Sequence, residues 1–204
     1  SMSWSAEAEE IRRRRELALA HGGDAAVARQ HEKGRLTIRE RIELLMDEGS
    51  FEEVGPAAGS GVRDENGELV GFDPANFILG FGKINGQRVV VGGEDFTVRG
   101  GSPSPAGLRK SVYTEELALQ YKLPLVRLHE GAGGSVGGTG GKGESLPGPV
   151  FAAPRFKSVA ECMATIPVAT AALGAVAGLP AARLVAAHFS VMSKPTAQIM
   201  TAGP

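Results

Sequence analysis

From residue 95 onward, apolar runs of strand length alternate with segments of helical pattern, and this alternation constrains the fold more than any other feature of the sequence. The expected strands are residues 95–98, 124–129, 167–174 and 189–192. The expected helices are residues 105–121, 155–164 and 179–187. Strands connected through helices pair in parallel, because the helix carries the chain back to the edge where the previous strand began. The sequence therefore predicts an α/β fold with a mainly parallel sheet.

The first third of the chain predicts helices and a loop. Residues 5–33 have a helical pattern that is interrupted near Gly22-Gly23. Thr37-Ile38-Arg39-Glu40 is a capping box, in which the hydroxyl and the carboxylate each accept a hydrogen bond from an otherwise unpaired amide. The helix that it starts has an apolar stripe. Residues 55–76 have the composition of a loop, with a turn at 64–67.

Residues 77–84 and 87–91 are the clearest pair of strands in the sequence. They flank Asn85-Gly86, and these two residue types adopt the positive φ angles of a type I′ turn. We therefore expect an antiparallel hairpin ahead of the parallel strands.

Glycine makes up 29 of the 204 residues, about twice the usual share of ~7%. Eight of these glycines lie within residues 131–143, after one expected strand, and a second turn at 174–178 runs from a strand into a helix. Amides at the start of a helix lack an intrahelical acceptor and lie at the positive end of its dipole. Such a turn can hold an enolate or a tetrahedral oxyanion through backbone N–H groups. A tight turn without a ligand remains the alternative explanation.

Several common sites are excluded by their context. Residues 138–143 match the dinucleotide pattern G-x-G-x-x-G, but Pro147 and Pro149 stand where the helix should begin. Ser135 matches the pattern G-x-S-x-G, but more glycine follows it instead of the helix that a hydrolase needs. The four histidines are scattered along the chain, so we expect no metal site.

Charge and cysteine content limit the partners and the compartment. Lys plus Arg is 22 and Asp plus Glu is 23, and the formal net charge of −1 gives little support for nucleic-acid binding. Cys162 is the single cysteine, so no disulfide framework exists and a reducing compartment such as the cytoplasm is expected. Residues 162–182 carry no charge, but they contain two prolines and two glycines, and we expect a buried strand, turn and helix there instead of a membrane span.

Five segments resemble, in the same order, the carboxyltransferase (β) subunit of biotin-dependent acyl-CoA carboxylases, the group of propionyl-CoA, methylcrotonyl-CoA and acetyl-CoA carboxylases. They are residues 34–47, the segment D-F-T-V-R-G-G-S at 95–102, the glycine-rich loop at 129–134, the turn at 174–178 with strand 189–192, and residues 199–204. The resemblance covers nearly the whole chain and corresponds to the N-terminal half of such a subunit. It implies a crotonase-like ββα spiral domain at 55–204, preceded by a helical extension at 1–54, with a second crotonase-like domain beyond this chain.

Two departures from the family pattern concern the expected site. The common family loop reads S-G-G-A-R-x-Q-E-G, whereas residues 130–135 read E-G-A-G-G-S and lack the arginine. The usual Gly-Gly of the second turn reads Gly178-Leu179, which keeps both N–H groups but adds a side chain. The identity of the acyl-CoA therefore stays open.

The resemblance implies a mechanism and residues for it. Carboxybiotin, carried on a partner chain, supplies CO2, and its ureido nitrogen takes the α-proton of an acyl-CoA without a metal. The amides of Gly178 and Leu179 then hold the thioester oxyanion, and Gly133 and Gly134 line the acyl pocket. Arg99, Ser102 and Lys110 are candidates for contacts to the CoA phosphates, with ordinary surface polarity as the alternative.

The resemblance also implies partners: a biotin carboxylase, a biotin carboxyl carrier and further copies of the subunit in a hexamer. Two alternatives remain open. One is another crotonase-type lyase or decarboxylase of CoA thioesters, for which Glu161 is the candidate acid. The other is a non-catalytic CoA-binding or assembly half-domain. Whether these 204 residues are active alone is also open.

Overall fold

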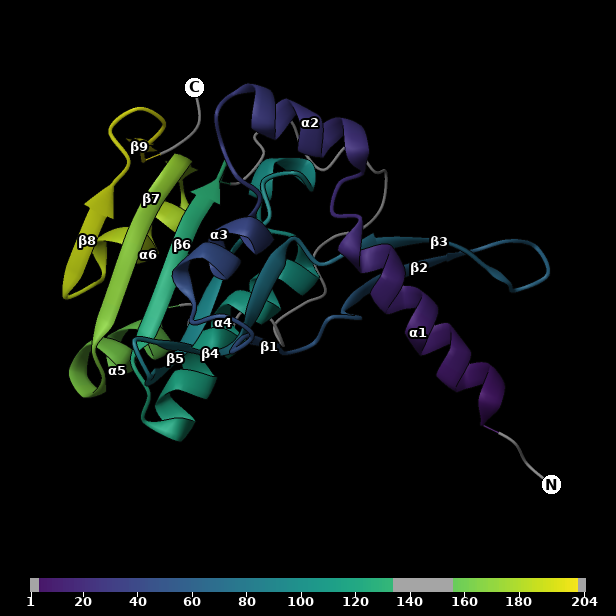
Figure 1. Cartoon of the computed structure of the whole chain (residues 1–204), viewed down its shortest axis with the longest axis horizontal. Helices are drawn as coiled ribbons and strands as arrows, with labels where there is room; N and C mark the ends of the chain where they lie inside the picture. Colours follow the sequence, from purple (N-terminus) through teal and green to yellow (C-terminus); the bar gives the residue numbers. More distant parts are fainter. Residues whose placement is uncertain (1–3, 134–155, 202–204) are drawn as a thin grey trace.

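The computed structural model describes residues 4–133 and 156–201, and it contains one large sheet with helices on both faces (Figure 1). The strand order of this sheet is β1-β4-β5-β6-β7-β8, and β9 also pairs with β7. Its strands are β1 (Glu52–Glu53), β4 (Phe77–Ile84), β5 (Gln87–Glu94), β6 (Leu125–Gly131), β7 (Val168–Ala177), β8 (Phe189–Met192) and β9 (Gln198–Met200). The helices are α1 (Ser5–Leu19), α2 (Asp24–Glu32), α3 (Ile38–Leu45), α4 (Pro105–Tyr121), α5 (Lys157–Thr165) and α6 (Leu179–Val185).

The predicted alternation of strands and helices produces the predicted parallel sheet. β5 pairs in parallel with β6, β6 with β7, and β7 with both β8 and β9. The hairpin of β4 and β5 is antiparallel, and its turn residues Asn85 (φ 49°) and Gly86 (φ 78°) have the expected positive φ angles. The capping box at Thr37 and Glu40 and the break between α1 and α2 are also confirmed.

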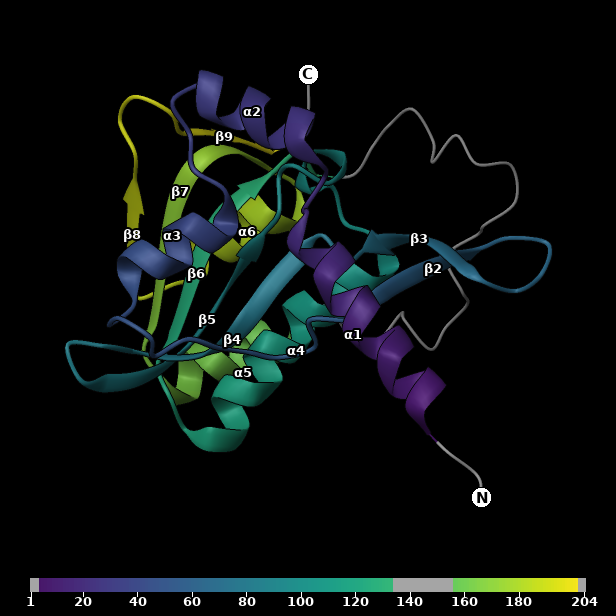
Figure 2. The same cartoon turned by 45° about the vertical axis from the view of Figure 1, so that its right-hand side comes forward.

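Alternating side chains give the sheet two apolar faces. On one face, Phe77 and Val90 pack against Leu117 of α4 and Cys162 of α5. On the other face, Val91 and Leu128 pack with side chains of α3. Figure 2 shows α3 and the α4–α5 pair on opposite sides of the strands. Within residues 4–133 and 156–201, no helix is long and apolar enough to cross a bilayer.

The expectation of a loop at 55–76 was wrong. β2 (Gly59–Arg63) and β3 (Leu69–Pro74) form a separate antiparallel hairpin, which lies beside α1 (Figure 1). β2 is mostly exposed and β3 is mostly of intermediate burial, and neither has the apolar alternation that identifies a half-buried strand, so the sequence pattern missed them. The turn between them does lie at 64–67, where the Asp64 carboxylate accepts hydrogen bonds from the amides of Asn66 and Glu68.

The expectation of a strand at 95–98 was also wrong. β5 ends at Glu94, and the Asp95 carboxylate accepts hydrogen bonds from the N–H and the hydroxyl of Thr97, which closes a turn. A short 3₁₀ turn, η1 (Arg99–Gly101), follows. The DFTVRGGS segment is therefore the loop that leads from β5 into α4.

The turn expected at 174–178 is shorter than predicted. β7 continues to Ala177, and Gly178 alone (φ 63°) turns the chain into α6. Gly174 lies inside the strand, where any Cβ atom would overlap the carboxylate of Glu130. The close approach of Glu130, and not a turn, explains why position 174 is a glycine.

Candidate active site

The two glycine-rich segments meet where β6 and β7 end. Gly133 has φ 75°, and a Cβ atom there would lie 3.0 Å from the carbonyl of Ala177 and 3.2 Å from the nitrogen of Gly178. Only a residue without a side chain permits this approach. The structure thus places Gly133 directly beside the turn into α6. Gly134 lies outside the described residues.

A small, partly open cleft lies beside this turn. Its wall includes Leu179, Pro180 and Arg183 of α6 together with Glu94 at the end of β5. Further lining residues come from the loop before α4 and from α4 itself: Gly101, Pro103, Gly107, Leu108 and Ser111. The cleft is therefore built where the strand β5, the DFTVRGGS loop and the first turn of α6 converge.

The two amides predicted to hold an oxyanion have different surroundings. The Gly178 N–H donates to the carbonyl oxygen of Thr201 at 3.2 Å, so it is bonded within the chain. Leu179 is the first residue of α6, a position whose N–H has no acceptor within the helix. Leu179 also lines the cleft. Of the two predicted donors, only the Leu179 amide lacks an acceptor within the helix and belongs to a residue that lines the cleft.

The three candidate CoA-phosphate residues are not brought together. Arg99 is exposed and forms an ion pair with Asp73. Ser102 lies between two cleft residues, and its carbonyl accepts a hydrogen bond from the side chain of Asn76. Lys110 is 7% exposed, and its Nζ donates to the carbonyl oxygen of Gly55 at 3.2 Å. Lys110 is therefore placed to hold the loop before β2 and not to reach a phosphate in solvent.

The buried ammonium of Lys110 leads to a prediction about pH. Burial lowers its pKa from 10.5 to about 8, so between these values the unfolded chain keeps a proton that the folded chain has released. Stability should rise with pH across this interval, by an amount of the order of 3 kcal/mol at most. In Lys110→Met this gain should disappear. Urea unfolding at pH 7.5, 9 and 10.5 measures it, with the exposed Lys194→Met as control; equal slopes for wild type and Lys110→Met would contradict the prediction.

A buried ion cluster, which the sequence patterns did not reveal, lies behind the cleft. The Glu115 carboxylate accepts hydrogen bonds from Arg127 of β6 (2.5 Å), Arg183 of α6 (2.7 Å) and the hydroxyl of Ser158 of α5 (2.5 Å). The side chains of the three charged residues are at most 2% exposed. Burial lowers the pKa of Arg127, and the Glu115 charge acts in the opposite direction. The cluster ties α6 to α4 and β6, and so fixes the position of Leu179.

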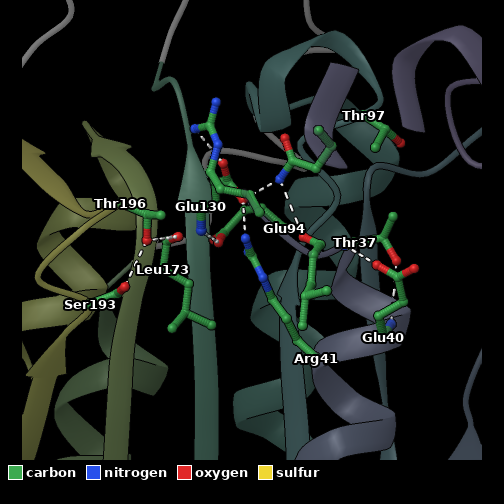
Figure 3. A network of polar contacts seen from close by, with 12 residues as sticks. Thr37, Glu40, Arg41, Glu94, Thr97, Glu130, Leu173, Ser193 and Thr196 are labelled. Atoms are coloured by element: carbon green, nitrogen blue, oxygen red, sulfur yellow. Dashed lines mark hydrogen bonds and ion pairs between the residues drawn. The ribbon is translucent and has the colours of Figure 1, made fainter. Parts of the chain in front are cut away.

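Glu130 is the centre of a second buried network. Its carboxylate accepts hydrogen bonds from Arg35 (2.8 Å), Arg41 (2.5 Å) and Gln30 (2.6 Å). Figure 3 shows Arg41 reaching from α3 to Glu130 on β6, with Glu94 close by. The network joins α2 and α3 to the strand that leads into the glycine-rich loop. Residues 34–47 resemble a sequence segment of the family. In the structure, Arg35 and Arg41 of this segment both bind Glu130.

Acidic residues near the cleft also differ from the sequence expectation. Glu161, the candidate acid of a lyase, lies on the exposed side of α5 and pairs with Lys157 at 3.7 Å. Glu94 lines the cleft instead, and its carboxylate lies 3.1 Å from Nδ1 of the buried His129. Within the described residues, no group of three or more His, Cys, Asp and Glu side chains could hold a metal ion.

Known proteins share this fold and much of this sequence. The propionyl-CoA carboxylase beta chain of Cereibacter sphaeroides is 38% identical over 133 residues, which is 63% of this chain and 25% of that protein. The beta chain of Saccharopolyspora erythraea is 32% identical over 197 residues, which is 96% of this chain and 35% of that protein. Transcarboxylase 12S, solved as a hexamer with methylmalonyl-CoA and methylmalonic acid bound, superimposes with a TM-score of 0.75 at 26% identity, over all of this chain and 39% of that one.

These likenesses confirm the expected crotonase-like fold. The chain spans only 25% and 35% of the two relatives' lengths. The family model described as carboxyl transferase domain matches residues 29–204. This chain belongs to the carboxyl transferase family.

Proposed function

We propose that this chain is the N-terminal crotonase-like part of the carboxyltransferase component of a biotin-dependent acyl-CoA carboxylase, with residues 1–54 as a helical extension. The observation that carries the proposal is a cleft lined by Leu179 at the turn where the two glycine-rich segments meet, in a chain whose family match spans residues 29–204. The reaction would move the carboxyl group of carboxybiotin to the α-carbon of an acyl-CoA.

The residues of this chain would act on the thioester. The Leu179 N–H would donate to the thioester oxygen as negative charge grows on it during enolate formation, which is where a fixed donor has its largest effect. Gly133, without a side chain, lets the chain after β6 lie against the turn at Gly178, and Leu108 and Phe77 supply apolar parts of the cleft wall. Carboxybiotin, carried by a partner protein, would supply the CO2 and accept the α-proton.

The proposal includes partners. A biotin carboxylase and a biotin carboxyl carrier must charge the biotin, and a cytoplasmic homo-hexamer is the expected assembly. The hexamer described for transcarboxylase 12S supports this assembly by similarity. Arg99 and Ser102 remain candidates for contacts to the CoA phosphates, since both belong to the loop that contributes Gly101 and Pro103 to the cleft wall.

One observation favours a second candidate function, a non-catalytic CoA-binding half-domain. The Gly178 N–H is already bonded to Thr201, which leaves one predicted donor instead of two. In that case the chain would bind acyl-CoA but depend on another chain for turnover.

The test is a coupled assay with biotin carboxylase, biotinylated carrier, ATP, radiolabelled bicarbonate and several acyl-CoAs, together with calorimetry of acyl-CoA binding. Label in the acyl-CoA product supports the carboxyltransferase. Binding without label supports the half-domain. Bicarbonate-independent cleavage of the acyl-CoA would instead show a lyase or a decarboxylase, and absence of binding would contradict all of these functions.

A further inference from the structure

We propose that Glu94, oriented by His129, is a proton-transfer residue of the cleft, which removes and returns the α-proton of a bound acyl-CoA without biotin or bicarbonate. This inference rests on the proposed function, because it requires an acyl thioester in the cleft with its oxygen at Leu179. It adds an activity, α-proton exchange, that carboxyl transfer from carboxybiotin does not require.

The side chain of Glu94 lies next to the first turn of α6. Both Glu94 and Pro180 of α6 approach Gly131. A Cβ atom on Gly131 would lie 3.2 Å from Cγ of Glu94 and 3.0 Å from Cγ of Pro180. The same cleft is lined by Glu94, Pro180 and Leu179. A thioester with its oxygen at the Leu179 amide would therefore lie in the cleft that the Glu94 side chain also lines.

His129 holds this carboxylate from the protein side. Its Nδ1 lies 3.2 Å and 3.1 Å from the two oxygens of Glu94, and the N–H of Glu130 donates to Oε2 at 3.3 Å. The contact with a carboxylate assigns the proton to Nδ1. The Nε2 atom is buried and has no hydrogen-bond partner among the described residues. A buried carboxylate–histidine pair with one unsatisfied ring nitrogen is unusual in a purely structural role, because buried polar atoms are normally paired.

The charges around Glu94 keep it ionised. Burial raises the pKa of Glu94. The His129 and Arg127 side chains on β6 act in the opposite direction, and the net pKa lies below the ordinary value. Arg183 of α6 lines the same cleft, and Glu115 of α4 is the partner of both arginines. An ionised carboxylate is the form that accepts a proton, and such a carboxylate can act as the base for an α-proton when the developing oxyanion is stabilised.

The proposed step balances without a co-reactant. The α C–H bond breaks, its electron pair becomes the enolate double bond, and the charge moves to the oxygen at the Leu179 N–H. The proton forms an O–H bond with Glu94. When the O–H proton on Glu94 exchanges with deuterated water before the return step, Glu94 gives a deuteron to the α-carbon, and the thioester is restored with deuterium at its α-position.

The experiment incubates the 204-residue chain with propionyl-CoA in deuterated buffer, without biotin, bicarbonate or ATP, and follows α-deuterium by mass spectrometry. Wild type should catalyse exchange, and Glu94→Gln, which preserves shape, should lower the rate by about 100-fold, the scale of general base catalysis. Glu161→Gln, an exposed acid on α5, should exchange like wild type. Exchange at the wild-type rate in Glu94→Gln would overturn the proposal.

His129→Asn separates a positioning role from a structural one. The asparagine keeps a donor near Glu94 but removes the imidazole, whose contact lowers the pKa of Glu94, so this pKa should rise and the acid limb of the rate profile should move to higher pH. An unmoved profile at an unchanged rate would contradict the role of His129. Parallel calorimetry with propionyl-CoA distinguishes the failures: binding without wild-type exchange overturns this inference alone, and absence of binding overturns the proposed function with it.

Discussion

Glu115→Ala should lower the free energy of unfolding by about 3–5 kcal/mol. Glu115 is 1% exposed and is the shared acceptor of Arg127 and Arg183. Its loss leaves two guanidinium groups in the interior without their counter-charge. Since water cannot reach them, their desolvation is no longer offset.

Urea unfolding of wild type and variant measures this effect. Glu116→Ala is the matched control, because Glu116 is the next residue of α4 and is exposed, and its change should stay within ~0.5 kcal/mol. Arg183 belongs to α6, so Glu115→Ala should also weaken acyl-CoA binding in the protein that remains folded. A loss below 1 kcal/mol would show that the cluster contributes little to the fold.

Local patterns predicted the elements whose own residues determine them. α4 begins at Pro105 and ends at Tyr121 as expected, since proline suits the first turn of a helix and Ser104 caps it. The Asn85-Gly86 hairpin and the capping box of α3 were also predictable, because each depends on contacts within a few residues. The polar hairpin of β2 and β3 has no such pattern, and it was missed.

The contact between the two glycine-rich segments could be predicted from the sequence, whereas the bonding of the groups around that contact could not. The sequence indicated that Gly133 and the turn at Gly178 belong to one site, and the structure places them in contact. It could not show that Lys110 is buried or that the Gly178 amide is already bonded. Both depend on residues that lie far away in the sequence.

The buried charges illustrate the same limit. Glu94 and His129 are 35 residues apart, Glu115 and Arg183 are 68 apart, and Arg35 and Glu130 are 95 apart. No periodicity or spacing rule pairs charges at such separations, and an isolated charged residue in a sequence is usually an exposed one. Glu94 therefore stayed hidden within the VVVGGEDF run, although it lines the cleft.

Leu179→Pro should have the largest effect on activity, because proline removes the backbone N–H that is proposed to donate to the thioester oxygen. Proline is tolerated in the first turn of a helix, where the N–H has no intrahelical partner, so α6 should still form. Loss of a single oxyanion donor costs about 100- to 1,000-fold in rate. Leu179→Ala is the matched control, since it shortens the same side chain but keeps the N–H.

The decisive measurement is the rate of acyl-CoA carboxylation by Leu179→Pro and Leu179→Ala in the coupled assay, with folding checked by circular dichroism. We predict that Leu179→Ala stays within about tenfold of wild type, whereas folded Leu179→Pro falls by at least about 100-fold. Equal rates for wild type and a folded Leu179→Pro would contradict the claim that this backbone nitrogen holds the thioester oxygen.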